Sequence, residues 1–216
     1  MNYAVSWSGG KDCALSMWRV WREHGPPAAL VTTYEEDGSR SRAHGLAPAL
    51  LAAQAAALGV PLVDVPTSLP GYAANFGAAL ARLRDEARVT AAVFGDIELE
   101  AHRSWFRKLC GDIGIDCLHP IWAVPREALL REFLDAGFVT RLVAVQDGRL
   151  APALLGRTLD EALIDEFRAA GIDLAGENGE YHSIVVDGPC FARPVALAER
   201  ARERRDGYWF LDLALD

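Results

Sequence analysis

Apolar positions in the first 118 residues alternate between short continuous runs and runs with helical spacing. Short continuous runs predict buried strands, here at residues 3–7, 29–34, 61–65, 91–94 and 117–118. Four helices are expected between them: one with Ala14, Met17, Trp18 and Trp21 on its apolar face, residues 46–58, residues 72–87, and one with Phe106, Leu109, Cys110 and Ile113 as its stripe. Repeated strand–helix units predict an α/β fold, a parallel sheet with helices on both faces.

The pattern becomes irregular after Trp122. The elements expected there are a helix at 126–136, a strand at 139–146, a helix at 159–170, and strands at 183–186 and 208–213. Spacing of this kind predicts a smaller α+β domain packed on the first. We therefore expect a larger domain at residues 1–124 and a smaller one at residues 125–216.

Composition and charge narrow the classes of function. The formal net charge is −8 and the pI is about 5.2, which disfavours a broad nucleic-acid surface. No apolar run approaches the roughly 18 residues of a membrane span, and the N-terminal run has no signal-peptide pattern, so a cytoplasmic location is expected. The four cysteines form no C-x-x-C pair, which predicts reduced thiols and argues against zinc.

The segment from Ser8 to Cys13, S-G-G-K-D-C, joins the first strand to the first helix. Its glycines Gly9 and Gly10 allow a tight turn, and a helix start adds unpaired N–H groups that favour an anion. Lys11 adds a compact charge in a chain with only two lysines against 20 arginines. A phosphate site is predicted, although neither the Walker A nor the G-x-G-x-x-G motif is present. The alternative is an ordinary turn with Asp12 as helix cap.

Three other positions are candidates for the same site. Asp96, with Gly95 before it, follows the fourth strand and would orient a nucleotide or hold Mg²⁺; an ordinary turn aspartate is the alternative. Arg103 would face phosphates or lie on a solvated helix face. His44 precedes the second helix, where a histidine with no catalytic role is one interpretation; a contact with a nucleotide is the other, and it is implied only by the resemblance described below. Three tryptophans are assigned to packing: Trp18, Trp21 and Trp105.

The turn resembles the S-G-G-x-D-S motif of the PP-loop ATP pyrophosphatases. Cys13 replaces the usual serine, which puts a hydroxyl contact to phosphate in doubt. Further blocks resemble, in order, the diphthine–ammonia ligase family: Phe94 to Ile97, the helix with Arg103, His119 to Trp122, and Gly176 to His182. The resemblance covers about residues 1–190. It implies a Rossmann-like (HUP) ATP-binding domain at 1–124 and an acceptor domain at 125–216.

An ATP-dependent, amide-forming ligase is what this resemblance implies. A carboxylate attacks the α-phosphorus of ATP, giving an acyl adenylate and pyrophosphate, and ammonia or an amine then displaces AMP. Nucleotide binding is assigned to residues 8–13, His44, Gly95, Asp96 and Arg103, with Mg²⁺ held by Asp96. Catalytic roles fall to Lys11, Asp12, Glu177 and Glu180.

The glycine-rich loop at residues 176–182 is expected to fold over the ATP site. Glu180 would orient the amine and Glu177 would support it; a solvated connection is the alternative. His182 differs from the residue that often follows this tyrosine in the family, so the acceptor can differ too.

The acceptor stays open. Diphthine is a modified histidine of a eukaryotic and archaeal elongation factor, and the arginine-rich composition hints at a bacterial chain. A protein substrate and a homodimer are also open. Two other functions remain: a PP-loop tRNA-modifying enzyme, disfavoured by the acidic charge, and a nucleotide-binding regulatory protein without turnover.

Overall fold

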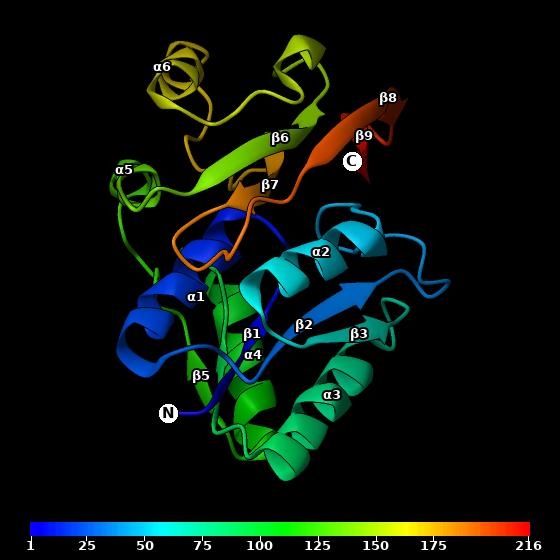
Figure 1. Ribbon diagram of the computed structural model, residues 1–216, viewed down its shortest axis with the longest axis vertical. Coiled ribbons are helices and arrows are strands. Elements are labelled where there is room, and N and C mark those ends of the chain that lie inside the picture. The colour runs from blue at the N-terminus through cyan, green and yellow to red at the C-terminus, as the bar shows by residue number, and fades with distance from the viewer.

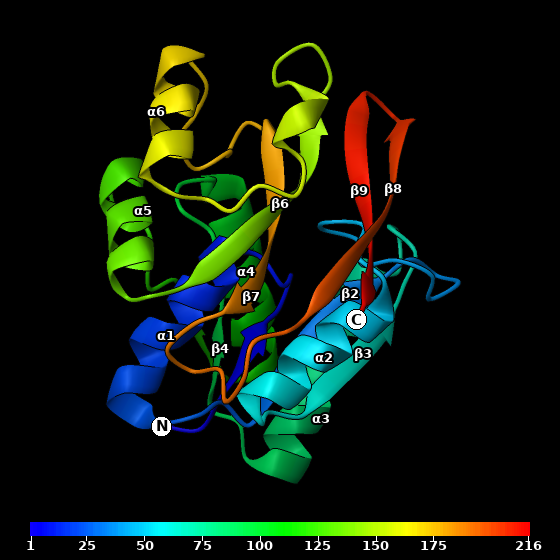
Figure 2. The same ribbon diagram turned by 45° about the horizontal axis from the view of Figure 1, so that its top comes forward.

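The computed structural model describes residues 1–216 and contains two separate sheets (Figures 1 and 2). The first sheet has strand order β3-β2-β1-β4-β5, and every pairing within it is parallel. Its strands are β1 (Tyr3–Ser6), β2 (Ala29–Tyr34), β3 (Leu62–Pro66), β4 (Ala91–Val93) and β5 (Asp116–Leu118). The predicted parallel α/β sheet is confirmed.

Helices cover both faces of this sheet. They are α1 (Lys11–His24), α2 (Pro48–Leu58), α3 (Tyr72–Ala87) and α4 (Glu100–Ile113). Side chains of β1 alternate between the two faces: Tyr3 and Val5 belong to the core with α1 and α2, while Ala4 belongs to the core with α3 and α4. None of the helices combines the length and apolar character that crossing a bilayer requires.

The second sheet is antiparallel, with strand order β7-β6-β9-β8. Its strands are β6 (Val139–Gln146), β7 (Tyr181–Asp187), β8 (Leu197–Arg205) and β9 (Tyr208–Leu215). Helices α5 (Arg126–Asp135) and α6 (Glu161–Ala169) and a short 3₁₀ turn (Pro152–Leu154) accompany it. The side chain of Asp160 caps α6 by accepting a hydrogen bond from the N–H of Leu163 at 2.8 Å.

Strand β8 is the element that the sequence pattern did not predict. Its residues L-A-E-R-A-R-E-R-R carry charge on both faces, and most of them are exposed. A charged strand of this kind suits the edge of a sheet, where it discourages pairing with other chains, but it lacks the apolar alternation of a half-buried strand. Trp18 and Trp21 pack against the core as expected, and Trp105, although 37% exposed, packs its ring against those of Tyr72 and Phe106.

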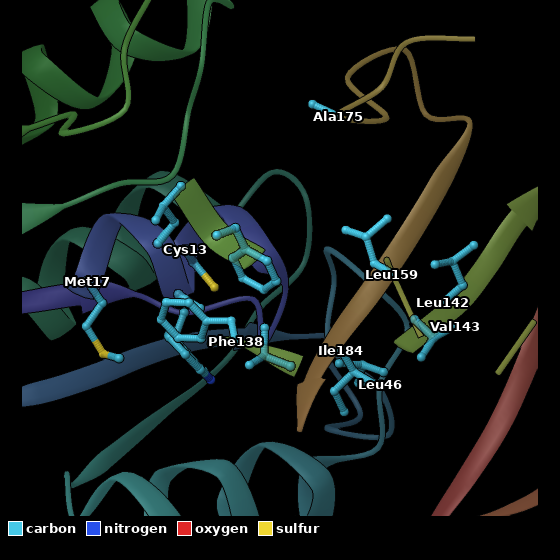
Figure 3. Close-up of a cluster of buried hydrophobic side chains, with 14 of the residues drawn as sticks. Cys13, Met17, Leu46, Phe138, Leu142, Val143, Leu159, Ala175 and Ile184 are labelled. Atoms are coloured by element: carbon cyan, nitrogen blue, oxygen red, sulfur yellow. The ribbon is translucent and has the colours of Figure 1, made fainter. Parts of the chain in front are cut away.

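One apolar core joins the two sheets. Cys13 and Met17 of α1 lie in the same buried cluster as Phe138, Leu142 and Ile184 of the second unit (Figure 3). Burial of apolar surface is the main stabilising term in folding. The two units therefore share their stabilisation across the junction.

Hydrogen bonds cross the same junction at the turn after β1. The carbonyl of Gly9 accepts from the N–H of Val185 at 2.9 Å and from Nε2 of Gln54 at 3.0 Å. Nε2 of Gln54 also donates to the carbonyl of Val185 at 2.6 Å, and its Oε1 accepts from the indole N–H of Trp7 at 3.0 Å. Gln54 is fully buried, and both ends of its amide are bonded.

Candidate active site

The turn between β1 and α1 has the open helix start that an anion site needs. Gly9 adopts a positive φ of 81°, and Gly10 is the extended N-cap residue of α1 without any side-chain cap. Asp12 stands inside the first helical turn, so the alternative of a turn capped by Asp12 does not hold. The N-terminus of α1 lies at the carboxyl edge of a parallel sheet, where no cap comes from Gly10 and the hydroxyl of Ser183 accepts a hydrogen bond from the N–H of Lys11 at 3.4 Å.

Close approaches explain two of the glycines. A Cβ at Gly10 would lie 2.3 Å from Cε1 of His44 and 3.3 Å from the carbonyl oxygen of Ser183. A Cβ at Gly95 would lie 2.8 Å from the backbone nitrogen of Cys13. Heavier residues at these positions would displace the walls of the site from the helix start.

Lys11 points into the junction of the two units. It is only 6% exposed, and its ammonium donates to the Asp12 carboxylate at 2.8 Å and to the carbonyl of Ala175. The ammonium also lies 5.1 Å from the centre of the Tyr181 ring. Burial alone would lower the pKa of Lys11, but Asp12 and Tyr181 raise it above its ordinary value, so the charge persists.

Ser8 and Cys13 complete the turn. The hydroxyl of Ser8 donates to the Cys13 sulfur at 3.3 Å, and the thiol of Cys13 donates to the Gly10 carbonyl at 3.1 Å. Burial raises the pKa of Cys13, so this thiol stays protonated. All four cysteines are free, as the sequence predicted.

Two cavities open beside this turn. The first, here called the strand-end cavity, has a volume of about 320 Å³ and lies at the ends of β1 and β4. It is lined by Ser6, Ser8, Asp12, Cys13, Ala43, His44, Phe94, Gly95, Asp96, Leu99, His102, Phe106 and Glu177. The second, the loop cavity, has a volume of about 220 Å³. It is lined by Lys11, Asp12, His44, Ala175, Gly176, Glu177, Gly179, Tyr181, His182 and Ser183.

The cavities share three residues, Asp12, His44 and Glu177. The loop at 176–182 therefore lies against the glycine turn, where the family resemblance implied that it would lie. A species held in one cavity adjoins a species held in the other across these three side chains.

The two loop glutamates lie in different surroundings. Glu177 is exposed at the rim that faces both cavities, and partial desolvation of its carboxyl together with Asp12 raises its pKa to about 7. Glu180 is 1% exposed, lines neither cavity, and accepts hydrogen bonds from the N–H groups of Asp173 at 3.0 Å and Asn178 at 3.1 Å. Burial alone would raise the pKa of Glu180, but these hydrogen bonds lower it. The structure thus directs Glu180 into its own loop, away from the expected acceptor role.

Asp96 reaches the strand-end cavity between two imidazoles. Its Oδ1 lies 3.2 Å from Nδ1 of His102, and its Oδ2 lies 3.6 Å from Nε2 of buried His119. No cluster of three or more His, Cys, Asp or Glu side chains forms a ready metal cage. One carboxylate in a phosphate-sized cavity nevertheless suits Mg²⁺, which often takes one or two carboxylates together with substrate phosphates.

Arg103 lines neither cavity. Its guanidinium stacks over the Trp122 ring at 4.3 Å and lies 3.5 Å from the Glu100 carboxylate. Its Nε is buried without a hydrogen-bond partner. The structure therefore does not bring Arg103 to the glycine turn with the other expected residues.

Three contributors were missed by the sequence reasoning: Gln54, Ala175 and Ser183. Gln54 is the one polar residue among the apolar residues of α2, and a lone amide in such a stripe was the signal available. Ala175 and Ser183 contribute a carbonyl and a hydroxyl from the second unit, and their contacts with Lys11 depend on how the two units pack.

The parallel sheet with a glycine turn and open helix start at its carboxyl edge defines a PP-loop protein. The chain belongs to the diphthamide synthase family: the family's N-terminal domain matches residues 1–117 and its C-terminal domain matches residues 125–214. The interval between the two matches runs from Leu118, the last residue of β5, to Val124, shortly before α5, where the chain passes from the first sheet to the second unit.

Two named enzymes have sequences that are similar to this chain at modest identity. The diphthine–ammonia ligase of Homo sapiens is 27% identical over 119 residues, which cover 53% of this chain and 45% of that protein. The Danio rerio enzyme of the same name is 26% identical over 122 residues, covering 55% of this chain and 48% of that protein. The chain thus spans about half the length of these relatives.

Among solved structures, one similar chain is a predicted subunit of tRNA methyltransferase from Methanocaldococcus jannaschii. It is 16% identical with a TM-score of 0.46, and the match covers 88% of this chain and 98% of that one.

Proposed function

We propose that this protein is an ATP-dependent, amide-forming ligase that cleaves ATP to AMP and pyrophosphate. The observation that carries the proposal is the meeting of two cavities at Asp12, His44 and Glu177. A ligase of this type needs one compartment for an acyl adenylate and an adjoining one for the amine. Bringing two reactants together in fixed geometry can itself supply much of the rate enhancement.

ATP occupies the strand-end cavity in this proposal, with its phosphates over residues 8–13. The N-terminus of α1 stabilises the negative charge on the departing pyrophosphate, and Lys11, which lines the adjoining loop cavity, adds positive charge from behind Asp12. Asp96 is the residue that would hold Mg²⁺, which when bound neutralises charge on the phosphate oxygens.

The attacking amine occupies the loop cavity, and Glu177 takes the proton that the amine loses. A carboxyl with a pKa near 7 suits a general base at neutral pH. Glu180 keeps the loop folded by binding its N–H groups. Diphthine–ammonia ligase is the name of the similar proteins, and a carboxylate of that kind, carried on a protein, is the first candidate substrate.

Product analysis tests the proposal. Purified protein is incubated with Mg²⁺-ATP and a panel of carboxylate and amine pairs, and nucleotides are separated by chromatography while pyrophosphate is assayed. AMP and pyrophosphate in equal amounts, dependent on both the carboxylate and the amine, are expected. ADP and phosphate as the main products would place the protein in another class.

A further inference from the structure

Two imidazole rings from different units meet where the cavities join. His44 comes from the segment before α2, and His182 comes from β7. Their ring centres are 4.9 Å apart, and the ring planes are inclined by 31°. His44 lines both cavities and His182 lines the loop cavity, yet neither has a role in the reaction described above.

The hydrogen bond of His44 fixes its tautomer. Its Nδ1 lies 3.0 Å from the carbonyl oxygen of Ser183, which can only accept, so Nδ1 carries the proton. The Nε2 of the neutral ring then carries a lone pair and acts as an acceptor. The Cε1 edge of the ring rests against Gly10, which holds the imidazole beside the helix start.

Both rings are neutral at physiological pH. Burial, His182 and Lys11 lower the pKa of His44 well below its usual range, and burial and Lys11 lower the pKa of His182 to about 4. Charged or titratable groups near the pair come from five elements. They are Lys11 and Asp12 of α1, Glu177 of the loop at 176–182, Tyr181 of β7, Tyr208 of β9 and Arg205 of β8. The buried ammonium of Lys11 makes a further positive charge in this cavity costly.

We propose that His44 and His182 bind the acceptor amine in its uncharged form. The inference rests on the proposed ligase function. A neutral amine offers N–H donors to the imidazole lone pairs and keeps its own lone pair for the acyl carbon. An alkylammonium ion has no such lone pair and would add a second cation beside Lys11. A cavity of about 220 Å³ fits ammonia or a small primary amine.

The chemical step balances with the residues present. The amine lone pair forms the new C–N bond, and the C–O bond of the acyl phosphate anhydride breaks, so AMP leaves with that electron pair. The surplus proton on nitrogen passes to the Glu177 carboxylate. The two imidazoles neither donate nor accept a proton in this step; they position the amine.

Side-chain NMR of the full-length protein with ¹⁵N-labelled histidine tests the proposal, with methylamine as the probe. At pH 9.5 methylamine is expected to shift the signals of His44 and His182, while His24, His102 and His119 serve as internal references. Apparent affinity for total methylamine should fall about tenfold per pH unit below the amine pKa of ~10.4. Tetramethylammonium should leave all five signals in place.

Two substitutions separate positioning from folding. In His182→Leu the affinity for methylamine, measured from the shift of His44, should weaken by roughly 2- to 13-fold, the size of one lost hydrogen bond. His182→Asn, which keeps an acceptor, should restore most of the affinity, and both proteins should unfold as cooperatively as the wild type. Absence of any shift in the wild type, or an equal shift with tetramethylammonium, overturns the inference. Because ATP cleavage is assayed separately, failure of the ligase proposal is distinguishable from failure of amine binding.

Discussion

Lys11 combines a full charge with nearly complete burial, and the second lysine of the chain provides a matched comparison. Lys11→Met would leave the Ala175 carbonyl and the Asp12 carboxylate without their donor. We expect the free energy of unfolding to fall by roughly 1–3 kcal/mol and ATP binding to weaken by roughly 1.5–3 kcal/mol. Urea titration and calorimetry measure the two effects.

Lys108→Met is the control for this change. Lys108 is exposed and pairs with Asp112 one helical turn away at 2.6 Å. Surface pairs of this type contribute about 0.3–0.5 kcal/mol, so both stability and ATP binding should change little. Equal effects of the two substitutions would show that burial of Lys11 has no special role.

The raised pKa of Glu177 predicts that the stability of the fold depends on pH in an unusual direction. Its folded-state pKa of about 7 lies above its ordinary value of 4.5, so the folded protein binds more protons between these values. Stability from this group is therefore present below pH 4.5 and is lost as pH rises through 7. Glu177→Gln should raise the melting temperature at pH 8 and change it little at pH 4. Thermal melts at both pH values check this, and a lower melting temperature at pH 8 would contradict it.

The same substitution has a kinetic counterpart. If Glu177 accepts the proton of the amine, Glu177→Gln should slow amide formation while leaving ATP affinity close to that of the wild type. The rise of the wild-type rate with pH should show an apparent pKa near 7 that the variant lacks.

At the level of single residues, chemistry was predictable and orientation was not. The pair Gly9-Gly10 beside Lys11 indicated the turn, because residue type alone restricts what such positions can do, whereas His44 was connected with the site only through the family resemblance. Glu180 and Arg103 were expected to point to ligands. Glu180 instead accepts hydrogen bonds from backbone N–H groups of its own loop, and Arg103 stacks over a tryptophan ring. Such local partners leave no pattern in the sequence.

Among the elements, the contact between the end of β4 and the start of α1 depends on Gly95. Gly95→Ala would place a methyl group 2.8 Å from the backbone nitrogen of Cys13, so α1 or the loop must shift. We expect lower stability and weaker ATP binding, since steric strain of this kind typically costs about 1–3 kcal/mol. Chemical unfolding and calorimetry provide the measurement.

A second glycine serves as the matched control. Gly111 lies within α4, and a Cβ there would meet nothing within 4 Å. Gly111→Ala should therefore stabilise the protein by roughly 0.5–1 kcal/mol through helix propensity, with ATP binding unchanged. A stabilising Gly95→Ala would show that the approach of β4 to α1 is loose.

Element types followed from periodicity where apolar residues dominate. The three central strands of the first sheet, β1, β2 and β4, are buried on both faces and appear in the sequence as continuous apolar runs, so their existence was plain from the sequence. β8 could not be found in this way because its exposed faces place no demand on residue type beyond solubility. Its pairing with β9 comes from the chain reversal at Asp206 and Gly207, both with positive φ.

For the whole molecule, the shared core predicts that the two units unfold together. The buried amide of Gln54 links Trp7, Gly9 and Val185 across the junction. Gln54→Leu keeps the volume but leaves the buried indole N–H of Trp7 without its acceptor, at a cost of roughly 1–3 kcal/mol. We expect a lower unfolding midpoint with a single transition in both fluorescence and circular dichroism.

Gln146→Leu is the control, because that half-buried side chain takes no part in the junction. It should leave the midpoint nearly unchanged. Separate transitions for the two probes in the wild type would show that the units fold independently. The sequence predicted two units from the change in spacing after residue 122, but it could not indicate that one core spans both, since apolar residues do not specify their partners.

The carbonyl of Gly9 is held by the backbone of β7, so the shape of the glycine turn is set partly by a strand more than 170 residues later in the chain. His44 against Ser183 and Lys11 against Ala175 add side-chain contacts that a foreign second domain would have to reproduce. Exchange of C-terminal halves between distant relatives by recombination would thus separate partners that fit only each other. Evolution of a new acceptor specificity is then expected to proceed by point substitution in the loop, as at position 182, rather than by shuffling of domains.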